Sequence, residues 1–334
     1  MKNFSGKIAF ITGGASGAGL GQAKVFSKAG MKVAIADVRQ EALDKAVAEL
    51  VEYGAKKENI LALKVDLTDR AQYTAAADKV EEVFGGPPHL LIQTAGVNSF
   101  GPIEASTFDD FDWVVGVCFD AVVNGFVIFV PRMLKAYANK EEFHVAVTSS
   151  MGGFMGGAGC GPYTAAKAAV NNLVYSYASA LVPYGGGATV LCPGNINSQI
   201  GDAEKYRPAH LKNTGYHVSE GTMKHLNSVH ATGIDPIELA EILKEAIENG
   251  RIIALPFADP TTWGPMLRNQ NAIIEEYLLT AEERQKAVDA RMAEMMRNRP
   301  QGGGPGGWEV PEGAERFGMA RGDLEWVAED RKKV

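Results

Sequence analysis

Short apolar segments alternate with longer segments of helical periodicity along most of this 334-residue chain. The first apolar run, Lys7–Thr12 (KIAFIT), is followed by a helical pattern over Ser16–Lys28, and Lys32–Ala36 is followed by Glu41–Tyr53. A strand, a helix and a second strand in that order form a right-handed crossover, so the two strands lie parallel in one sheet. The strands are apolar on both faces, which indicates that helices cover the sheet on both sides. The pattern therefore predicts an α/β fold with a doubly wound parallel sheet.

The same alternation continues to residue 255 and predicts about seven strands in one domain. The further strands are expected over Ile60–Val65, His89–Gln93, His144–Ser149, Ala188–Leu191 and Arg251–Leu255, and the further helices over Asp69–Phe84, Phe108–Tyr137, Tyr163–Val182 and from Asp235 to Gly250. We assign residues 1–258 to this domain. It includes a long segment without regular periodicity, residues 197–230, and segments of this kind are usually functional lids.

The C-terminal residues 259–334 depart from the alternation and are expected to form a helical arm and a tail. Thr280 and Glu283 have the spacing of a capping box, which predicts a helix that runs to about Arg299. A glycine-rich segment, Gln301–Gly307, follows it and separates it from a polar tail. We expect a surface arm that packs on its own or a neighbouring subunit, and a lid over the functional site is the alternative.

Charge and composition exclude several classes of protein. The chain has 33 Lys and Arg against 40 Asp and Glu, a formal net charge of −7, and no basic run, so neither a nucleic-acid partner nor a membrane partner is expected. The longest apolar stretch, Ala121–Val130, is much shorter than the roughly 18 residues of a membrane span. Three cysteines without a C-x-x-C pair and six histidines without an H-x-x-x-H pair argue against disulfides and zinc. With no signal-peptide pattern, we expect a cytoplasmic protein that binds no metal.

A glycine-rich turn, Thr12–Gly19 (TGGASGAG), lies directly between the first strand and the first helix. Glycines allow a tight turn there, and the free N–H groups of the helix N-terminus favour a pyrophosphate. Asp37 ends the second strand, where a carboxylate binds the hydroxyls of an adenosine ribose and repels a 2′-phosphate. NAD is therefore the expected cofactor. Arg39 keeps NADP as the less favoured alternative.

A tyrosine and a lysine, Tyr163 and Lys167, are four positions apart in the helical segment that follows Ser149-Ser150. Residues at i and i+4 share one face of a helix, so the ammonium group can lie near the phenol. A phenol with a pKa near 10 is a poor base at pH 7, and a nearby cation favours the phenolate. Ser150 ends a parallel strand at the edge where ligands bind, so its hydroxyl can hold a substrate oxygen beside the phenol.

Taken together, these motifs resemble the short-chain dehydrogenase/reductase superfamily over about residues 4–255. The resemblance rests on TGGASGAG (12–19), Asp37, Asp66-Leu67, Ala95-Gly96, Ser150, Tyr163-x-x-x-Lys167 and Pro193-Gly194-Asn195-Ile196. It implies a Rossmann-type fold in which Tyr163 is the general acid/base, Ser150 orients the carbinol oxygen, and Lys167 lowers the tyrosine pKa and binds the nicotinamide ribose. The cofactor-binding residues that it implies are Gly13, Ser16, Ala18, Gly19, Asp37, Asp66, Leu67, Ala95, Gly96, Tyr163, Lys167, Pro193, Gly194 and Ile196.

At a finer level the chain resembles bacterial Cα-dehydrogenases of lignin-derived β-aryl ethers. The similar segments are residues 10–26, 36–39, 94–104 (TAGVNSFGPIE), 111–133 and 149–157 (SSMGGFMGG). Those enzymes oxidise a benzylic secondary alcohol to an aryl ketone with NAD, which makes a bulky aryl alcohol or ketone the expected substrate. Two alternatives stay open: a dehydrogenase of another bulky alcohol, such as a hydroxysteroid or terpenol, and an NAD-binding regulator without turnover. The resemblance also implies a homodimer or homotetramer.

The chain departs from the superfamily pattern at two positions. Gln93-Thr94-Ala95-Gly96 replaces the frequent Asn-Asn-Ala-Gly, and Cys118 stands where the superfamily usually has a catalytic asparagine. That asparagine kinks its helix and positions a water linked to the lysine. We count Cys118 among the catalytic positions because its backbone carbonyl can do much of the same work. The alternatives are a slower proton relay and a plain structural role.

Substrate-binding residues are expected from the segment 197–230 and from neighbouring loops. Aromatic and methionine side chains there suit a flat apolar substrate. The expected substrate-binding residues are Phe100, Met151, Phe154, Tyr206 and Tyr216. The same loops carry Met155, Arg207, His210 and His217.

Overall fold

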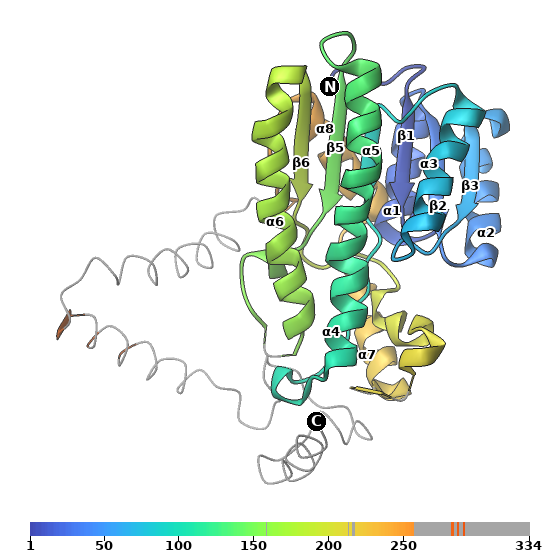
Figure 1. Cartoon of the computed structure of the whole chain (residues 1–334). Coiled ribbons are helices and arrows are strands. Elements are labelled where there is room, and N and C mark those ends of the chain that lie inside the picture. Colours follow the sequence, from blue (N-terminus) through green and yellow to red (C-terminus); the bar gives the residue numbers. More distant parts are fainter. Residues whose placement is uncertain are drawn as a thin grey trace.

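The computed structural model describes residues 1–157, 159–212, 214–215 and 218–256, together with Glu282, Glu283, Lys286 and Ala290. Its centre is a seven-stranded sheet in the order β3-β2-β1-β4-β5-β6-β7, in which every neighbouring pair is parallel (Figure 1). The strands are β1 (Ile8–Thr12), β2 (Lys32–Asp37), β3 (Ile60–Lys64), β4 (Leu90–Gln93), β5 (Phe143–Thr148), β6 (Gly186–Leu191) and β7 (Ile253–Ala254). This topology confirms the predicted doubly wound α/β fold and its number of strands.

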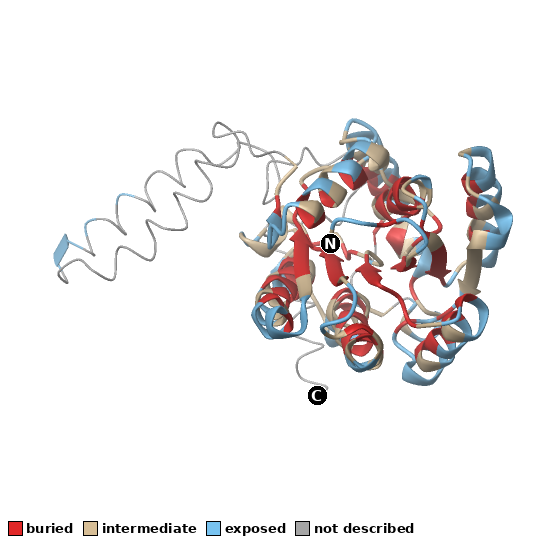
Figure 2. Cartoon of the chain, turned by 90° about the horizontal axis from the view of Figure 1, so that it is seen from above, coloured by how far each residue is buried: buried red, intermediate tan, exposed pale blue. Residues whose placement is uncertain are grey.

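Helices cover both faces of the sheet, and the buried residues lie between the layers (Figure 2). One face packs against α3 (Arg70–Phe84), α5 (Ala121–Tyr137) and α6 (Gly161–Leu181). The other face packs against α1 (Gly17–Lys28), α2 (Gln40–Glu52) and α8 (Pro236–Glu248). The short 3-10 turns are η1 (Lys57–Asn59), η2 (Ile103–Ala105), η4 (Met151–Gly153), η5 (Val182–Tyr184), η6 (Ile200–Tyr206) and η7 (Ala209–Leu211).

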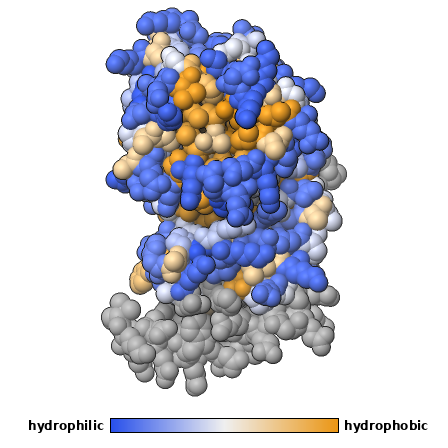
Figure 3. Space-filling model, turned by 90° about the vertical axis from the view of Figure 1, so that its right-hand side faces the viewer, coloured by the Kyte–Doolittle hydropathy of each residue, from blue (hydrophilic) through white to orange (hydrophobic). Residues whose placement is uncertain are grey.

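Among the described residues, β3 is an edge strand of the sheet, paired on one side only, with β2. Residues 60–63 of this strand are partly exposed, and Val51 and Val83 of the flanking helices are exposed. Figure 3 shows apolar side chains gathered on this face of the molecule, surrounded by polar ones. The edge strand is therefore shielded only partly by its two neighbouring helices.

The long helix expected over Phe108–Tyr137 is present with these bounds, but it contains a π turn that the sequence did not indicate. α4 (Phe108–Val115) passes into the π-helical turn η3 (Gly116–Asp120) before α5 begins. A π turn adds a residue to one turn of the helix, which apolar periodicity does not reveal. Residues 108–137 are long and apolar enough to span a membrane by length and composition alone, yet 56% of the most apolar window is buried inside the fold, as in a core helix.

The segment 197–230 is more ordered than its sequence predicts, because α7 (Glu220–His230) follows η6 and η7. Ser219 caps α7 by accepting a hydrogen bond from the Thr222 N–H, and Met223 and Leu226 form a small apolar cluster with Ala105 and Val218. In the sequence, only the buried apolar residues Met223 and Leu226 mark this helix, and a pattern of two residues is too short to predict one.

Several predictions fall outside the described residues. These are the helix Thr280–Arg299, apart from four of its residues, the tail that follows it, and Tyr216 and His217 of the segment 197–230. The arm 259–334 therefore stays a prediction.

His144 on β5 gives the fold a pH-dependent stability. Its buried Nε2 lies 2.9 Å from Oγ1 of Thr189, whose hydroxyl donates to the Arg251 carbonyl. Burial lowers the pKa of His144 to about 3 from the ordinary 6.5, so the folded chain keeps the ring neutral while the unfolded chain is protonated below pH 6.5. The contribution of His144 to stability is therefore full above pH 6.5 and is lost as the pH falls toward 3, by about 1.4 kcal/mol per pH unit.

We expect the free energy of unfolding, measured in urea, to fall as the pH is lowered through this window. His144→Gln keeps an amide donor near Thr189 and should reduce the slope by about 1.4 kcal/mol per pH unit. The matched control is His210→Gln, at an exposed position, which should leave the slope unchanged. Equal slopes for the wild type and His144→Gln would contradict the argument.

Candidate active site

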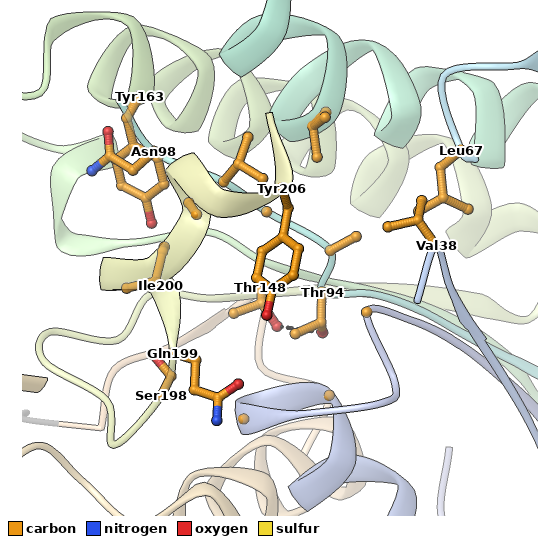
Figure 4. Close-up of a pocket in the computed structure, with 18 of the residues that line it drawn as sticks. Val38, Leu67, Thr94, Asn98, Thr148, Tyr163, Ser198, Gln199, Ile200 and Tyr206 are labelled. Carbon is orange, nitrogen blue, oxygen red and sulfur yellow. Dashed lines mark hydrogen bonds between the residues drawn. The ribbon is translucent and has the colours of Figure 1, made fainter. Parts of the chain in front are cut away.

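A cavity of about 810 Å³ lies along the carboxyl edge of the sheet, and η6 and η7 cover part of it. Figure 4 shows Val38 and Leu67 at one end and Tyr163 at the other, with Thr94 and Thr148 between them. All fourteen residues expected to bind the cofactor line this cavity, and so does Ser150. The structure thus brings together residues that the sequence places between positions 13 and 196.

The glycine-rich turn after β1 is shaped for close approach to a ligand. Gly13 has a φ of +64°, and a Cβ there would come within 2.8 Å of the Ala95 Cα. A Cβ on Gly19 would lie 2.1 Å from the carbonyl oxygen of Gly13. The turn therefore requires glycine at both positions, and it leads into α1, whose N-terminus faces the cavity with free N–H groups. A pyrophosphate fits this cradle, because these groups and the helix dipole favour an anion.

The carboxylate of Asp37 lies where β2 ends and is almost fully buried. Both of its oxygens accept from Arg39, with Nε to Oδ1 at 2.9 Å and Nη2 to Oδ2 at 3.0 Å. The same Nη2 donates to the Ser16 hydroxyl at 2.8 Å, and the guanidinium lies 4.9 Å from the ring centre of Tyr206. The bidentate pair with Asp37, the largest cause, raises the pKa of Arg39. Arg39 thus joins the ribose carboxylate to the glycine-rich turn.

Hydroxyl groups at the ends of three strands fix the floor of the cavity. The Thr94 hydroxyl donates to the Gln22 amide oxygen at 2.6 Å and lies 2.8 Å from the Thr148 hydroxyl (dashed in Figure 4). Thr12 Oγ1 accepts from the backbone N–H groups of Thr94 and Ala95 at 2.9 and 3.2 Å. This network holds the loop after β4 in a fixed position against β1 and β5.

Three side chains that can move a proton meet at the far end of the cavity. The Ser150 hydroxyl lies beside the Tyr163 phenol, and Lys167 Nζ lies 5.4 Å from the Tyr163 ring centre and donates to the Thr148 carbonyl at 2.8 Å. Burial raises the pKa of Tyr163, and the nearby Ser150 hydroxyl partly opposes this rise. Burial also lowers the pKa of Lys167. Without cofactor, the tyrosine is therefore held as a protonated phenol, whereas the resemblance implies that Lys167 lowers its pKa.

Cys118 does not line the cavity but lies behind it, in the π turn η3. Its fully buried Sγ donates to the Val97 carbonyl at 3.1 Å and accepts from the Val97 N–H at 3.4 Å. Burial raises the pKa of the thiol, so it stays protonated. The helix is thus distorted here even though cysteine replaces asparagine, and Cys118 fixes the loop that carries Ala95 and Gly96.

Gln93, the other departure from the superfamily pattern, points away from the cavity. Its amide donates to the Val122 carbonyl at 3.1 Å and accepts from the Tyr73 hydroxyl at 3.3 Å. Gly125 makes room for it, since a Cβ there would lie 2.1 Å from Gln93 Oε1. The change from asparagine is therefore accommodated by packing between β4 and α5.

The wall beside Tyr163 is apolar and comes mainly from α4 and the segment 197–230. Trp113, Ala203, Val97, Val117 and Leu211 pack in one cluster with Tyr163, and these five residues also line the cavity. Among the described residues, the turns η6 and η7 contribute Ile200, Ala203, Tyr206, His210 and Leu211 to the lining of the cavity.

The expected substrate-binding residues have different positions. Phe100 lines the cavity, and Tyr206 does so beside Arg39, toward the ribose carboxylate rather than Tyr163. Met151 and Phe154 are not among the described residues that line it, because the turn η4 packs on α6 and Phe154 packs against the main core. Tyr216 lies outside the described residues.

A buried ion pair attaches the segment 197–230 to α4. Arg207 Nη2 donates to Asp110 Oδ1, and its Nε lies 3.0 Å from Glu204 Oε1, with neither Arg207 nor Asp110 exposed at its side chain. The guanidinium lies 4.6 Å from the ring centre of Trp113, and Asp110 also closes the capping box of α4 with Thr107. Sequence reasoning placed Arg207 in the segment but missed this pair, whose members are 97 positions apart.

Comparison with known proteins agrees with this geometry. The model of the family described as short chain dehydrogenase matches residues 7–207. A C alpha-dehydrogenase of Sphingobium sp. (strain NBRC 103272 / SYK-6) is 50% identical over 259 residues, which cover 78% of this chain and 83% of that protein. The crystal structure of the apo form of LigD from Sphingobium sp. strain SYK-6 superposes with a TM-score of 0.66 at 43% identity, covering 81% of this chain and 97% of that one.

A short-chain dehydrogenase/reductase from Burkholderia phymatum, solved in complex with NAD, superposes with a TM-score of 0.74 at 31% identity, covering 82% of this chain and 97% of that chain. The family uses NAD or NADP to act on small-molecule alcohols. Since the family model spans more than half of the sequence, and the proton-transferring residues meet in one cavity, the chain belongs to the short-chain dehydrogenases and is an alcohol dehydrogenase.

Proposed function

We propose that this enzyme oxidises the benzylic secondary alcohol of a lignin-derived aryl ether to a ketone with NAD. The observation that carries the proposal is the position of Tyr163, which shares one cluster with the apolar side chains of Trp113, Val117 and Leu211. A flat aryl group suits such a wall when its carbinol is at the phenol. The relative that is 50% identical is named a C alpha-dehydrogenase, which supports the same substrate class.

Asp37 supports NAD rather than NADP. Its nearly buried carboxylate is suited to accept hydrogen bonds from two ribose hydroxyls and would repel a 2′-phosphate. Arg39 is a cation beside that position, and its two side-chain hydrogen bonds to Asp37 reduce its availability to a phosphate. The neighbour from Burkholderia phymatum was solved with NAD, in agreement with this choice.

Ser150, Tyr163 and Lys167 have separate roles in the transfer of the proton. When bound, NAD supplies the acceptor for the hydride. Ser150 donates to the substrate oxygen, and Tyr163 Oη takes the proton of the alcohol. Lys167, 5.4 Å from the Tyr163 ring centre, would stabilise the phenolate once the site is filled.

The absorbance of NADH at 340 nm tests the proposal. Purified enzyme is mixed with NAD⁺ or NADP⁺ and with aryl-propanol β-aryl ethers, simple benzylic alcohols or steroid alcohols. We expect fast NADH formation from the aryl ethers, with NAD⁺ preferred at least about tenfold. The reason is that repulsion between the negative Asp37 carboxylate and a negative 2′-phosphate costs more than about 1.4 kcal/mol. Turnover of a steroid alcohol alone would keep the chemistry and overturn the substrate class. Bound NAD without any turnover would favour the regulator.

Two further parts of the proposal concern the assembly and the location of the enzyme. Val127 and Val182 are 64% and 67% exposed on α5 and η5, which supports a homodimer or homotetramer through these helices. A single-subunit mass in solution would contradict it. We also propose a cytoplasmic location, which the free cysteines Cys118, Cys160 and Cys192 support.

A further inference from the structure

Helix α1 buries a single polar side chain, that of Gln22. The other buried residues of this helix are apolar or glycine, and Gln22 is fully buried among them. Its Nε2 donates to Thr148 Oγ1 at 3.1 Å, and its Oε1 accepts from the Thr94 hydroxyl at 2.6 Å. Thr94 follows β4 and Thr148 ends β5, and both line the middle of the cavity (Figure 4). Gln22 is therefore connected to the floor of the active site from behind.

The three side chains form a closed ring of hydrogen bonds. The two hydroxyl oxygens lie 2.8 Å apart. Thr94 uses its only hydroxyl proton on Gln22, so the proton between the two threonines comes from Thr148. A glutamine amide turned by 180° would reverse the direction of the ring without freeing either proton. Both hydroxyls therefore offer the cavity acceptor lone pairs and no donor.

The same threonine carries the acceptor for the lysine of the site. Lys167 is 4% exposed, and its Nζ donates to the Thr148 carbonyl at 2.8 Å. Among the described residues, the ionisable groups that act on this ammonium are the Tyr163 phenol and the thiols of Cys118 and Cys192, with no carboxylate. Burial raises the pKa of all three, so each is neutral at pH 7. A buried ammonium without a counter-ion depends on neutral acceptors such as this carbonyl.

The sheet alone does not hold Thr148 on the side of β4. Pairing between β4 and β5 ends at Val147, one position earlier, whereas Thr148 still pairs with Leu191 of β6. On the side of β4, the Thr148 hydroxyl is instead held by the ring with Gln22 and Thr94. The ring thus continues the connection between the two strands beyond the end of their ladder.

We propose that Gln22 is a positioning residue for Lys167: the ring that it closes holds Thr148 so that its carbonyl accepts from the ammonium group. The inference rests on the role of Lys167 in the proposed proton chemistry, and it adds a residue of α1 to that role. A lysine kept charged in this way stabilises the phenolate of Tyr163.

Titration of Lys167 in the free enzyme tests the proposal directly. The ¹³Cε resonance of Lys167, assigned with Lys167→Met, is followed by NMR against pH in the wild type and in Gln22→Leu. Leucine keeps an apolar side chain of similar size and opens the ring. We expect the titration midpoint of Lys167 to be at least about half a pH unit lower in Gln22→Leu, because the ammonium loses a fixed acceptor while it stays buried. Equal midpoints would overturn the proposal.

The pH dependence of alcohol oxidation gives a second readout. At saturating NAD⁺, kcat/KM for an aryl alcohol should rise with the ionisation of Tyr163, and Gln22→Leu should move this midpoint at least about half a pH unit to the alkaline side. At pH 7 such a shift lowers kcat/KM about threefold, and above both midpoints the two proteins should agree within about twofold. A smaller fraction of folded enzyme would instead lower the rate equally at every pH.

Gln93→Leu is the matched control. Gln93 is also a buried glutamine with two hydrogen bonds, to Val122 and Tyr73, but it points away from the cavity. Its loss should lower stability as Gln22→Leu does and leave both midpoints in place. Thr94→Val opens the ring at another member and should move both midpoints as Gln22→Leu does, whereas Thr94→Ser keeps the hydroxyl and should have the wild-type midpoints.

The outcomes separate the two proposals. If Gln22→Leu and Gln93→Leu move the midpoints alike, or if Thr94→Val moves neither, Gln22 supports only the fold and its assigned role is wrong. If Gln22→Leu does not fold, Thr94→Val and Thr94→Ser decide the question. A wild type that oxidises no aryl alcohol would overturn the proposed substrate, while the titration of the free enzyme would still decide the role of Gln22.

Discussion

Tyr163→Phe is expected to lower kcat by a factor of about 10³ or more while the affinity for NAD stays within about twofold. The phenol oxygen is the group that exchanges a proton with the carbinol, and phenylalanine keeps the ring in the apolar cluster with Trp113 and Val117. Steady-state rates at 340 nm measure the first quantity, and calorimetric titration with NAD measures the second. Activity within tenfold of the wild type would show that another group carries the proton.

Tyr73→Phe is the matched control. Tyr73 is also fully buried, and its hydroxyl donates to Gln93 at 3.3 Å, outside the cavity. Loss of that hydroxyl should cost about 1 kcal/mol of stability and leave kcat unchanged.

The raised pKa of Tyr163 also sets the sign of the pH dependence. The phenol of the free enzyme is protonated in the neutral range, and the base form becomes more populated as the pH rises. Alcohol oxidation by the wild type should therefore accelerate from pH 7 toward alkaline pH, and Tyr163→Phe should show no such rise.

The parts of this protein that local signals encode were predictable. Strands such as Ile8–Thr12 are apolar runs with β-branched residues, and the parallel order places Asp37 and Ser150 at one edge. The spacing of Tyr163 and Lys167 on one helical face required no tertiary information. All the expected cofactor-binding residues consequently line one cavity.

The missed features depend on contacts between distant segments. The π turn around Cys118 arises where that residue bonds to Val97, and neither position carries a local signal for it. Met155 and Phe154 follow Ser150 closely, but the direction of the turn η4 sends Phe154 toward the core. Asn98 lines the cavity as well, and its position in the sequence carries no local signal for this.

The buried pair between Arg207 and Asp110 leads to the second large effect. Arg207→Met keeps most of the side-chain volume but leaves the buried carboxylate of Asp110, and that of Glu204, without their common cation. Removing one partner of a buried pair typically costs roughly 3–5 kcal/mol, and we expect a loss of about 4 kcal/mol here. The loss of stability should affect η6 and η7 most, because Arg207 links these turns to Asp110 of α4.

We expect Arg207→Met to open this part of the segment and to lower kcat/KM for the aryl alcohol at least about thirtyfold, because Ala203 and Leu211 leave the wall beside Tyr163. Chymotrypsin should then cleave after Tyr206 and Leu211 at least about tenfold faster than in the wild type, since the open state becomes populated. Affinity for NAD should change less than the affinity for the alcohol.

Two further proteins decide whether the charge is the cause. Adding Asp110→Asn to Arg207→Met removes one uncompensated carboxylate but keeps an acceptor for the Thr107 cap, so it should restore part of the protection from chymotrypsin. Lys205→Gln breaks the exposed pair with Asp202 in the same segment and should change neither protection nor kcat/KM. If Arg207→Met is cleaved no faster than the wild type, the segment is held by its apolar contacts with Trp113 and its neighbours rather than by the buried ion pair.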